Sequence, residues 1–378
     1  MMKKIFFLLL LIPTLTKALP LDLAKTSKSA IMIEASTGNV IFEKNPNEKL
    51  HPASMTKIMT MLLVMEAIDD SVIRWDEMVT VSANASGMGG SQILLETNEK
   101  MTVEDLFKGV AIASGNDAAV ALAEKIAGSE EVFVGMMNKK AKDLGLENTN
   151  FKNPHGLDAT NHYSTAKDMS ILAKELIKHE KVLKYTSIYE TYLRENLDTK
   201  IWLVNTNKLV RFYKGVDGLK TGFTEGAGYC LTTTAKKNEM RLITVVMGSE
   251  TATVRNAETT EMLDYGFAQY ELNTILTKKT NLGKIKVLNG KTKYSKVVPK
   301  EDITFLKKKS DKEVKTNYKL KLDKVKSPIK VGDKIGRVLV YKDLKKVREV
   351  ELTVKENNDK VNIIIAYFRN LKDTIIGE

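Results

Sequence analysis

Three short groups of residues carry side chains that could together perform acyl transfer. The first has a serine with a lysine three positions later, the second a serine with an asparagine two positions later, and the third a lysine followed by threonine and glycine. A serine nucleophile with a nearby base can form an ester with a carbonyl substrate. The groups are Ser54-Met55-Thr56-Lys57, Ser114-Gly115-Asn116 and Lys220-Thr221-Gly222.

The first two groups supply a nucleophile and its proton acceptors. Ser54 and Lys57 share one face if they lie on a helix, and the positive end of that helix favours a developing oxyanion. Lys57 can accept a proton near neutral pH only if burial and a neighbouring cation lower its pKa, and we expect Lys220 to be that cation. Ser114 can relay a proton to the leaving amine, and the Asn116 amide can hold a peptide carbonyl or orient the lysine.

The third group suits a substrate that ends in a carboxylate. Lys220 and Thr221 are expected on a strand edge, where an extended peptide can add as a further strand. Gly222 leaves room for the acyl group to approach the backbone. We expect the backbone N–H groups of Ser54 and Phe223 to form the oxyanion hole. Each group alone is weak evidence, because such tripeptides also occur as helix caps, loops and turns.

The order of elements predicts one domain whose sheet takes strands from both ends. Residues 30–43 are typical of a hairpin, and strand patterns return between residues 218 and 247. We therefore expect an all-helical region inserted between the strands. Helix patterns occur at residues 54–68, 103–113, 118–126, 130–144, 165–178 and 255–267.

Beyond residue 273 the pattern changes to short alternating runs separated by turns, which predicts a small β-sandwich or barrel. The N-terminus has Lys3 and Lys4, an apolar run at residues 5–12 and a small-residue site at Thr16-Lys17-Ala18. This pattern is typical of a secretory signal peptide, and the run is short for a transmembrane anchor, the alternative. We predict a signal peptide at 1–18, a catalytic domain at 19–272, a β-rich domain at 273–366 and an amphipathic tail at 367–378.

Charge and composition indicate which classes of binding partner the protein could have. The net charge is +12, and residues 273–378 carry 28 Lys and Arg against 13 Asp and Glu. That surface suits an anionic cell wall or membrane face, although a solvated lysine-rich surface is the alternative. With 7% aromatic residues and no nucleic-acid motif, we expect no nucleic-acid binding. Cys230 is the single cysteine, and the four histidines lack zinc spacing, so we expect no disulfide, metal or cofactor.

The sequence around the three groups resembles a known family. Residues 51–60, His-Pro-Ala-Ser-Met-Thr-Lys-Ile-Met-Thr, are similar to the P-A-S-x-T-K-[IM]-M-T segment of low-molecular-mass penicillin-binding proteins. These are the serine D-alanyl-D-alanine carboxypeptidases of peptidase family S11. Residues 153–157 and 215–222 resemble two further signatures of that family. The resemblance covers the predicted catalytic domain and, more loosely, the β-rich domain.

The resemblance implies an α/β (α+β) fold, namely a serine-β-lactamase/DD-peptidase-like domain with a helical insert, followed by a small all-β C-terminal domain. It implies removal of the terminal D-alanine from peptidoglycan pentapeptide stems through a serine acyl-enzyme, and inhibition by β-lactams. Arg255 occupies a place where the family often has an arginine for the substrate carboxylate. By the same resemblance Ser54 is the nucleophile and Lys57 the general base, and Ser114, Asn116, Lys220 and Thr221 complete the site.

Phe223 departs from relatives that carry a polar residue such as histidine there. The backbone N–H of Phe223 is unaffected by this difference in side chain. We therefore expect the difference to change only substrate preference or turnover.

Three other kinds of protein could carry some or all of these motifs. A class A β-lactamase needs a deacylating E-x-x-L-N loop, whereas the nearest string here, residues 180–184, lacks the asparagine, and the C-terminal domain is unexpected for such an enzyme. A non-catalytic wall-binding or β-lactam-sensing protein has no need of the full set of catalytic side chains. A DD-endopeptidase would carry every one of these motifs, so this alternative stays open.

The C-terminal tail has an amphipathic pattern, because Ile364, Phe368, Leu371 and Ile375 recur at helical spacing. About three turns make a marginal anchor alone, so we expect weak peripheral membrane attachment helped by the basic domain. The alternative is that residues 362–367 form the last strand.

Overall fold

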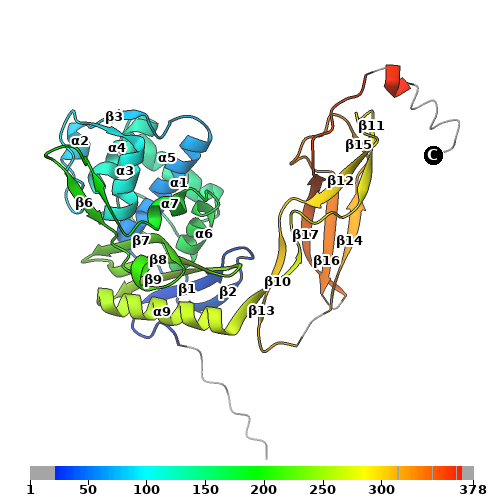
Figure 1. Cartoon of the computed structure of the whole chain (residues 1–378). Helices are drawn as coiled ribbons and strands as arrows, with labels where there is room; N and C mark the ends of the chain where they lie inside the picture. The colour runs from blue at the N-terminus through cyan, green and yellow to red at the C-terminus, as the bar shows by residue number, and fades with distance from the viewer. Residues whose placement is uncertain (1–21, 313–314, 343, 363, 368–378) are drawn as a thin grey trace, which may run out of the picture.

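The computed structural model describes residues 22–312, 315–342, 344–362 and 364–367. The predicted signal peptide lies outside the described residues, and so does the predicted tail except for Tyr367. Figure 1 shows a lobe of mixed helix and sheet followed by a β-rich lobe. The predicted architecture, a mixed domain followed by an all-β domain, is confirmed.

The central sheet has five strands in the order β2-β1-β9-β8-β7, all antiparallel. β1 pairs directly with β9, with Ile31 opposite Val245. The sheet therefore joins the two ends of the domain, as predicted, and it leaves β7 at one edge. The strands are β1 (Ser29–Glu34), β2 (Val40–Lys44), β7 (Val216–Thr224), β8 (Gly228–Lys237) and β9 (Met240–Ser249).

The region between β2 and β7 is mainly helical, but the prediction of an all-helical insert is wrong. Two hairpins interrupt it, β3 (Met78–Thr80) with β4 (Lys100–Thr102) and β5 (Glu190–Leu193) with β6 (Ile201–Val204). Strands of three or four residues are too short to give a clear two-residue hydrophobic period. The helical elements are η1 (Ala53–Thr56), α1 (Lys57–Asp69), α2 (Ala83–Ser86), α3 (Val103–Lys108), η2 (Gly109–Ala113), α4 (Asn116–Ala127), α5 (Glu130–Asp143), α6 (Ala166–Leu176), α7 (Val182–Thr186) and α8 (Leu209–Phe212).

Helices cover both faces of the sheet (Figure 1). α1 is the central helix of one face, with Met61 and Leu62 fully buried, and it packs among the other helices of the insert. α9 (Ala252–Gln269) covers the opposite face, where Met262 and Leu263 pack against apolar side chains of β1, β8 and β9. A fully buried side chain of this size contributes about 1.5–3 kcal/mol, so the two layers hold the sheet and α1 firmly.

The β-rich lobe starts directly after α9. β10 (Tyr270–Leu276) pairs with β13 (Ile303–Lys308), and a six-stranded sheet has the order β14-β16-β17-β12-β11-β15. The core of the β-rich lobe is made mainly of valine, leucine and isoleucine side chains. The domain boundary at residues 272/273 stays a prediction. The strands are β11 (Lys284–Leu288), β12 (Tyr294–Pro299), β14 (Thr316–Leu322), β15 (Val325–Lys326), β16 (Gly336–Lys342) and β17 (Lys345–Val354).

The alternative of a final strand at residues 362–367 is wrong for the described residues. Residues 364–367 form a helical turn, and the Ala366 backbone N–H donates to the Asn362 carbonyl at 2.9 Å. Within the described part of the chain, no helix combines the length and apolarity needed to cross a membrane.

Candidate active site

Ser54 lies on a short 3₁₀ turn, η1, which precedes α1, rather than on the first turn of the α-helix as expected. The Met55 backbone N–H donates to the Pro52 carbonyl at 3.1 Å, and Ala53 adopts a φ of 48°. A positive φ is uncommon for alanine and costs about 1–2 kcal/mol. The turn leaves Ser54 partly accessible while Lys57, at the start of α1, is completely buried.

Two glycines allow neighbouring backbone to press against this turn. A Cβ on Gly156 would lie 1.9 Å from the Ala53 carbonyl oxygen, and Gly156 also has a φ of 93°. A Cβ on Gly222 would lie 2.8 Å from the Pro52 carbonyl oxygen and 3.2 Å from the Ser54 nitrogen. We expected Gly222 to make room for an acyl group. Its contacts give a different reason, since glycine lets β7 approach the nucleophile turn.

The Lys57 amine has three oxygen neighbours. Its Nζ lies 3.0 Å from Ser54 Oγ, 2.6 Å from Asn116 Oδ1 and 2.7 Å from the His155 carbonyl oxygen. The Asn116 Nδ2 group donates to the Gly89 carbonyl at 2.7 Å, which orients the amide with its oxygen toward Lys57. The structure therefore joins the first two sequence groups through one buried amine.

Burial lowers the pKa of Lys57 well below its ordinary value. The charge of Lys220 lowers it further, whereas the carboxylate of Asp117 acts in the opposite direction. Burial, followed by the charge of Arg255, lowers the pKa of Lys220 to about 7. The charge of Lys220 therefore lowers the pKa of Lys57, as we expected.

Lys220 and Thr221 lie on the edge strand β7. Lys220 is 1% exposed, and its Nζ donates to the Thr221 carbonyl at 3.1 Å. Arg255 reaches from α9, on the far face of the sheet, to the Cys230 carbonyl at 3.5 Å. Cys230 stands opposite Gly222 in the β7–β8 register, so Arg255 reaches the strand beside the third group. Phe223 follows on β7 with half of its surface exposed, and its ring lies 4.4 Å from that of Tyr229.

Ser114 lies at the junction between η2 and α4 with a φ of 67° and a ψ of 27°. This left-handed conformation is uncommon for serine and makes the sharp turn that brings α4 back beside α3. Ser114 is 3% exposed, and Asn116, two residues later, contacts Lys57.

Three contributors to the site were missed in the sequence. The Asp117 carboxylate accepts hydrogen bonds from the Ile93 and Leu95 backbone N–H groups and so holds the loop before β4. The His155 backbone carbonyl accepts a hydrogen bond from the Lys57 amine. Thr206 contacts Thr221. The position of Asp117 in the first turn of a helix is a weak sequence signal for its role. The sequence carries no signal for the roles of His155 and Thr206.

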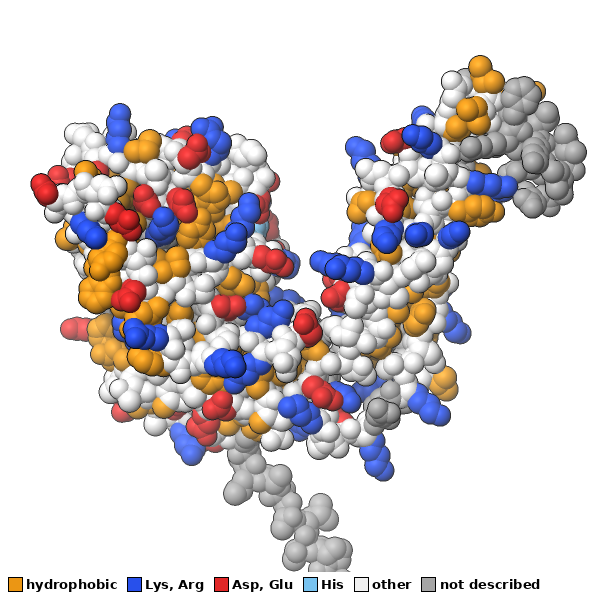
Figure 2. All heavy atoms as spheres, in the orientation of Figure 1, with side chains coloured by type: hydrophobic (Ala, Val, Ile, Leu, Met, Phe, Trp, Pro, Cys, Tyr) orange, Lys and Arg blue, Asp and Glu red, His pale blue; other side chains and the backbone are white. Residues whose placement is uncertain are grey.

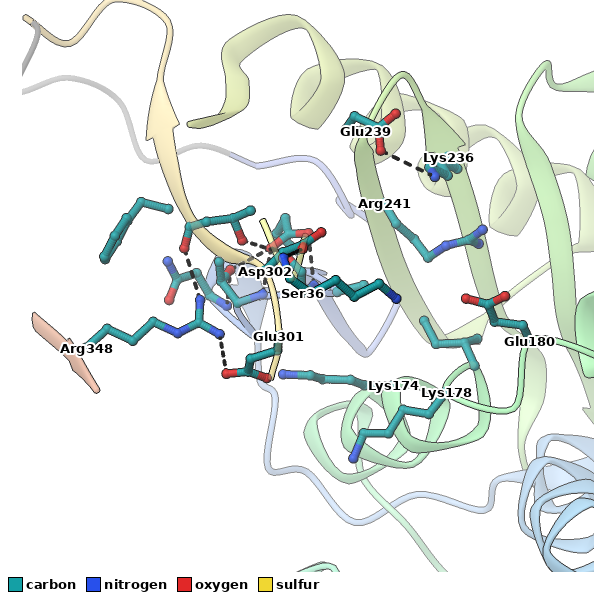
Figure 3. Close-up of a pocket in the computed structure, with 18 of the residues that line it drawn as sticks. Ser36, Lys174, Lys178, Glu180, Lys236, Glu239, Arg241, Glu301, Asp302 and Arg348 are labelled. Atoms are coloured by element: carbon teal, nitrogen blue, oxygen red, sulfur yellow. Dashed lines mark hydrogen bonds and ion pairs between the residues drawn. The ribbon is translucent and has the colours of Figure 1, made fainter. Parts of the chain in front are cut away.

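A cavity of about 1190 Å³ between the two lobes contains none of the predicted site residues. Figure 3 shows its charged lining, with side chains from α6 and the β8–β9 hairpin facing others from the β-rich lobe. Arg348 pairs with Glu301 at 3.0 Å, and Lys236 lies 3.8 Å from Glu239. The Ser36 and Thr37 hydroxyls donate to the Glu34 carboxylate there at 2.9 and 2.7 Å, but the buried lysine that could act as a base lies beside Ser54, so we place the chemistry at Ser54. Among the described residues, no cluster of His, Cys, Asp and Glu could hold a metal ion.

Comparison with known proteins identifies the family. The peptidase S11 profile, described as D-alanyl-D-alanine carboxypeptidase, matches residues 16–251. The chain belongs to this family. The C-terminal domain profile of penicillin-binding protein 5 matches residues 270–360. The predicted family and fold class are therefore confirmed, and the second match does not favour the class A β-lactamase alternative.

Relatives cover nearly the whole chain. The D-alanyl-D-alanine carboxypeptidase DacF of Bacillus subtilis is 51% identical over 93% of this chain and 91% of its own length. The crystal structure of penicillin-binding protein 5 from Haemophilus influenzae, at 34% identity, covers 89% of this chain and 98% of its own with a TM-score of 0.71. Penicillin-binding protein D2 from Listeria monocytogenes, solved in an ampicillin-bound form, covers 64% of this chain and 97% of its own at 33% identity and a TM-score of 0.58.

Proposed function

We propose that this protein removes the terminal D-alanine from peptidoglycan pentapeptide stems through an acyl-enzyme on Ser54. The observation that carries the proposal is the surroundings of the Lys57 amine, which contacts Ser54 Oγ and two further oxygen atoms. Membership of the carboxypeptidase family supports the same reaction.

The geometry suits Lys57 as a neutral general base. A neutral amine has two N–H groups and one lone pair. When its hydrogens bind the Asn116 and His155 oxygens at 2.6 and 2.7 Å, the lone pair faces Ser54 Oγ at 3.0 Å. The lowered pKa of Lys57 favours this form near neutral pH.

The reaction then proceeds in two halves. Ser54 Oγ attacks the carbonyl carbon of the D-Ala–D-Ala bond while its proton moves to Lys57, and the backbone N–H groups of Ser54 and Phe223 stabilise the oxyanion. The C–N bond breaks, and the departing D-alanine amine takes a proton passed from Lys57 through Ser114. A water molecule, deprotonated by Lys57, attacks the ester carbonyl carbon. The ester C–O bond breaks, and Lys57 returns the proton to Ser54 Oγ as the shortened stem leaves.

Three side chains are assigned to the substrate's terminal carboxylate. Lys220 and Arg255 provide positive charge, and Thr221 provides a hydroxyl on the edge strand. Charged donors of this kind form strong hydrogen bonds to carboxylates. Asn116 is assigned to a peptide carbonyl as well as to Lys57.

We propose that β-lactams inhibit the enzyme by acylating the same serine. A β-lactam presents a strained amide and a carboxylate to the groups that receive D-Ala–D-Ala. The ampicillin-bound structure of the Listeria relative supports this part of the proposal.

We also propose that the protein is exported and acts at the outer face of the cytoplasmic membrane or in the wall. The N-terminal pattern is typical of a signal peptide, and the excess of basic residues beyond residue 273 suits an anionic surface. Figure 2 shows lysine and arginine side chains spread over the β-rich lobe in the view drawn. Weak peripheral attachment through that lobe and the tail stays part of this proposal.

Release of D-alanine from diacetyl-L-Lys-D-Ala-D-Ala tests the assignment of Lys57. Lys57→Met should lower kcat/KM by about 10²–10⁴-fold, the usual contribution of a general base. Lys139→Met, which removes an exposed lysine of α5, is the matched control and should leave the rate unchanged. A folded Lys57→Met enzyme with a rate near that of the wild type would refute the base assignment. A wild-type enzyme that releases no D-alanine would refute the activity itself.

A further inference from the structure

A rigid polar segment, residues 205–207, joins β6 to α8 beside the site. Asn205 and Asn207 are each 1% exposed, and their side chains bind backbone rather than solvent. Asn205 Nδ2 donates to the Thr186 and Ile188 carbonyls at 3.0 and 2.8 Å, and Asn207 Nδ2 donates to the Gly218 carbonyl at 3.0 Å. The two asparagines therefore fix the position of the residue between them.

That residue, Thr206, touches both walls of the site. Its backbone N–H donates to the Ile112 carbonyl at 3.1 Å, two residues before Ser114. Its Oγ1 accepts a hydrogen bond from Thr221 Oγ1 at 2.7 Å, on β7. Its side chain is partly exposed, so it borders the accessible part of the site rather than the core. No motif in the sequence points to it.

Each of the two threonine hydroxyls has a single hydrogen, which limits the hydrogen bonds that Thr221 can donate at one time. A threonine hydroxyl has one hydrogen to donate and two lone pairs that accept. In the structure Thr221 uses its single hydrogen on Thr206. When Thr221 turns its hydrogen to a substrate carboxylate, Thr206 can keep the contact only by donating its own hydrogen to Thr221. The resulting chain runs from Thr206 to Thr221 to the carboxylate, and each bond in such a chain strengthens the next.

We propose that Thr206 is a positioning residue that acts through Thr221 to set the enzyme's affinity for ligands with a free carboxylate. This inference rests on the proposed function, because it concerns the subsite that receives the terminal carboxylate. Thr206 acts only through Thr221, so its hydroxyl should have no effect once the Thr221 hydroxyl has been removed. The neighbouring cations, Lys220 and Arg255, remain in place and keep a residual preference for the acid.

The test compares acylation by benzylpenicillin with acylation by its methyl ester, which lacks the carboxylate. The wild-type enzyme should prefer the acid, and Thr206→Val should reduce that preference about two- to fourfold, because Thr221 keeps its own bond to the carboxylate and loses only the donor that strengthens it. Thr206→Ser, which keeps the hydroxyl, should restore it. Thr191→Val, on the neighbouring β5, is a control for a threonine-to-valine change and should have no effect.

A double-mutant cycle with Thr221→Val decides whether the two hydroxyls are coupled. The double variant should be no worse than Thr221→Val alone, because Thr206 acts only through the Thr221 hydroxyl. Additive losses, or an equal fall with acid and ester in Thr206→Val, would overturn the inference and leave Thr206 with a structural role. Failure of the wild-type enzyme to be acylated by either compound would instead overturn the proposed function.

Discussion

Replacement of Lys220 by methionine should make the folded protein more stable while it removes activity. Lys220 is 1% exposed, and burial together with Arg255 lowers its pKa to about 7, from an ordinary value of 10.5. Below pH 7 the folded protein must therefore keep a charge in a buried place. Between pH 7 and 10.5 the unfolded chain binds this proton and the folded protein does not, so wild-type stability rises with pH across that window.

The size of the effect follows from the two pKa values. At 1.36 kcal/mol per pKa unit, charging Lys220 destabilises the folded protein by about 5 kcal/mol at pH 6 but only about 2 kcal/mol at pH 9. The stability advantage of Lys220→Met should therefore shrink by about 3 kcal/mol between these pH values. This difference does not depend on how well methionine packs, because packing is the same at both.

Urea unfolding of wild type and variant at pH 6 and pH 9 measures this difference. Lys284→Met, which removes an exposed lysine from β11, is the control and should show no comparable change between the two pH values. A stability difference between Lys220→Met and wild type that is independent of pH would refute the idea that Lys220 is a buried, proton-releasing group in the folded protein.

Three further predictions concern the same site. The KM for D-Ala–D-Ala peptides should rise about tenfold as pH increases through 7 and Lys220 loses its charge, and a pH profile of KM would show it. Gly156→Ala should abolish penicillin labelling, because its Cβ would lie 1.9 Å from the Ala53 oxygen, whereas Gly145→Ala, also at positive φ but in open space, should keep it. Asp117→Asn should lower stability by about 1–3 kcal/mol in urea unfolding, because backbone N–H groups lose a charged acceptor.

The large elements could be predicted from the sequence because their patterns are long. α5 and α6 span residues 130–143 and 166–176, close to the predicted limits of 130–144 and 165–178. A sheet with strands from both ends of the domain was predicted from the positions of the strand patterns, and the structure adds that β1 and β9 are the strands that join the two ends. Short elements carry less information, and both hairpins in the insert were missed for that reason.

Local geometry at the site depends on packing that the sequence does not display. The 3₁₀ turn at Ser54 forms where Gly156 and Gly222 bring backbone against it, and these residues lie far away along the chain. The role of the His155 carbonyl follows from the path of a loop, and a backbone atom leaves no signal in a residue's identity. Thr206 was missed because its importance comes from a single contact with Thr221.

In the proposed reaction Ser54 forms the acyl-enzyme with Lys57 as its base. Mass spectrometry of the purified protein after benzylpenicillin, with peptide mapping, tests it most directly, beside D-alanine release from diacetyl-L-Lys-D-Ala-D-Ala. We expect one long-lived adduct on the peptide that contains Ser54, no adduct in Ser54→Ala, and D-alanine release by the wild type only. An adduct on another residue, or penicillin turnover without peptide hydrolysis, would contradict the account.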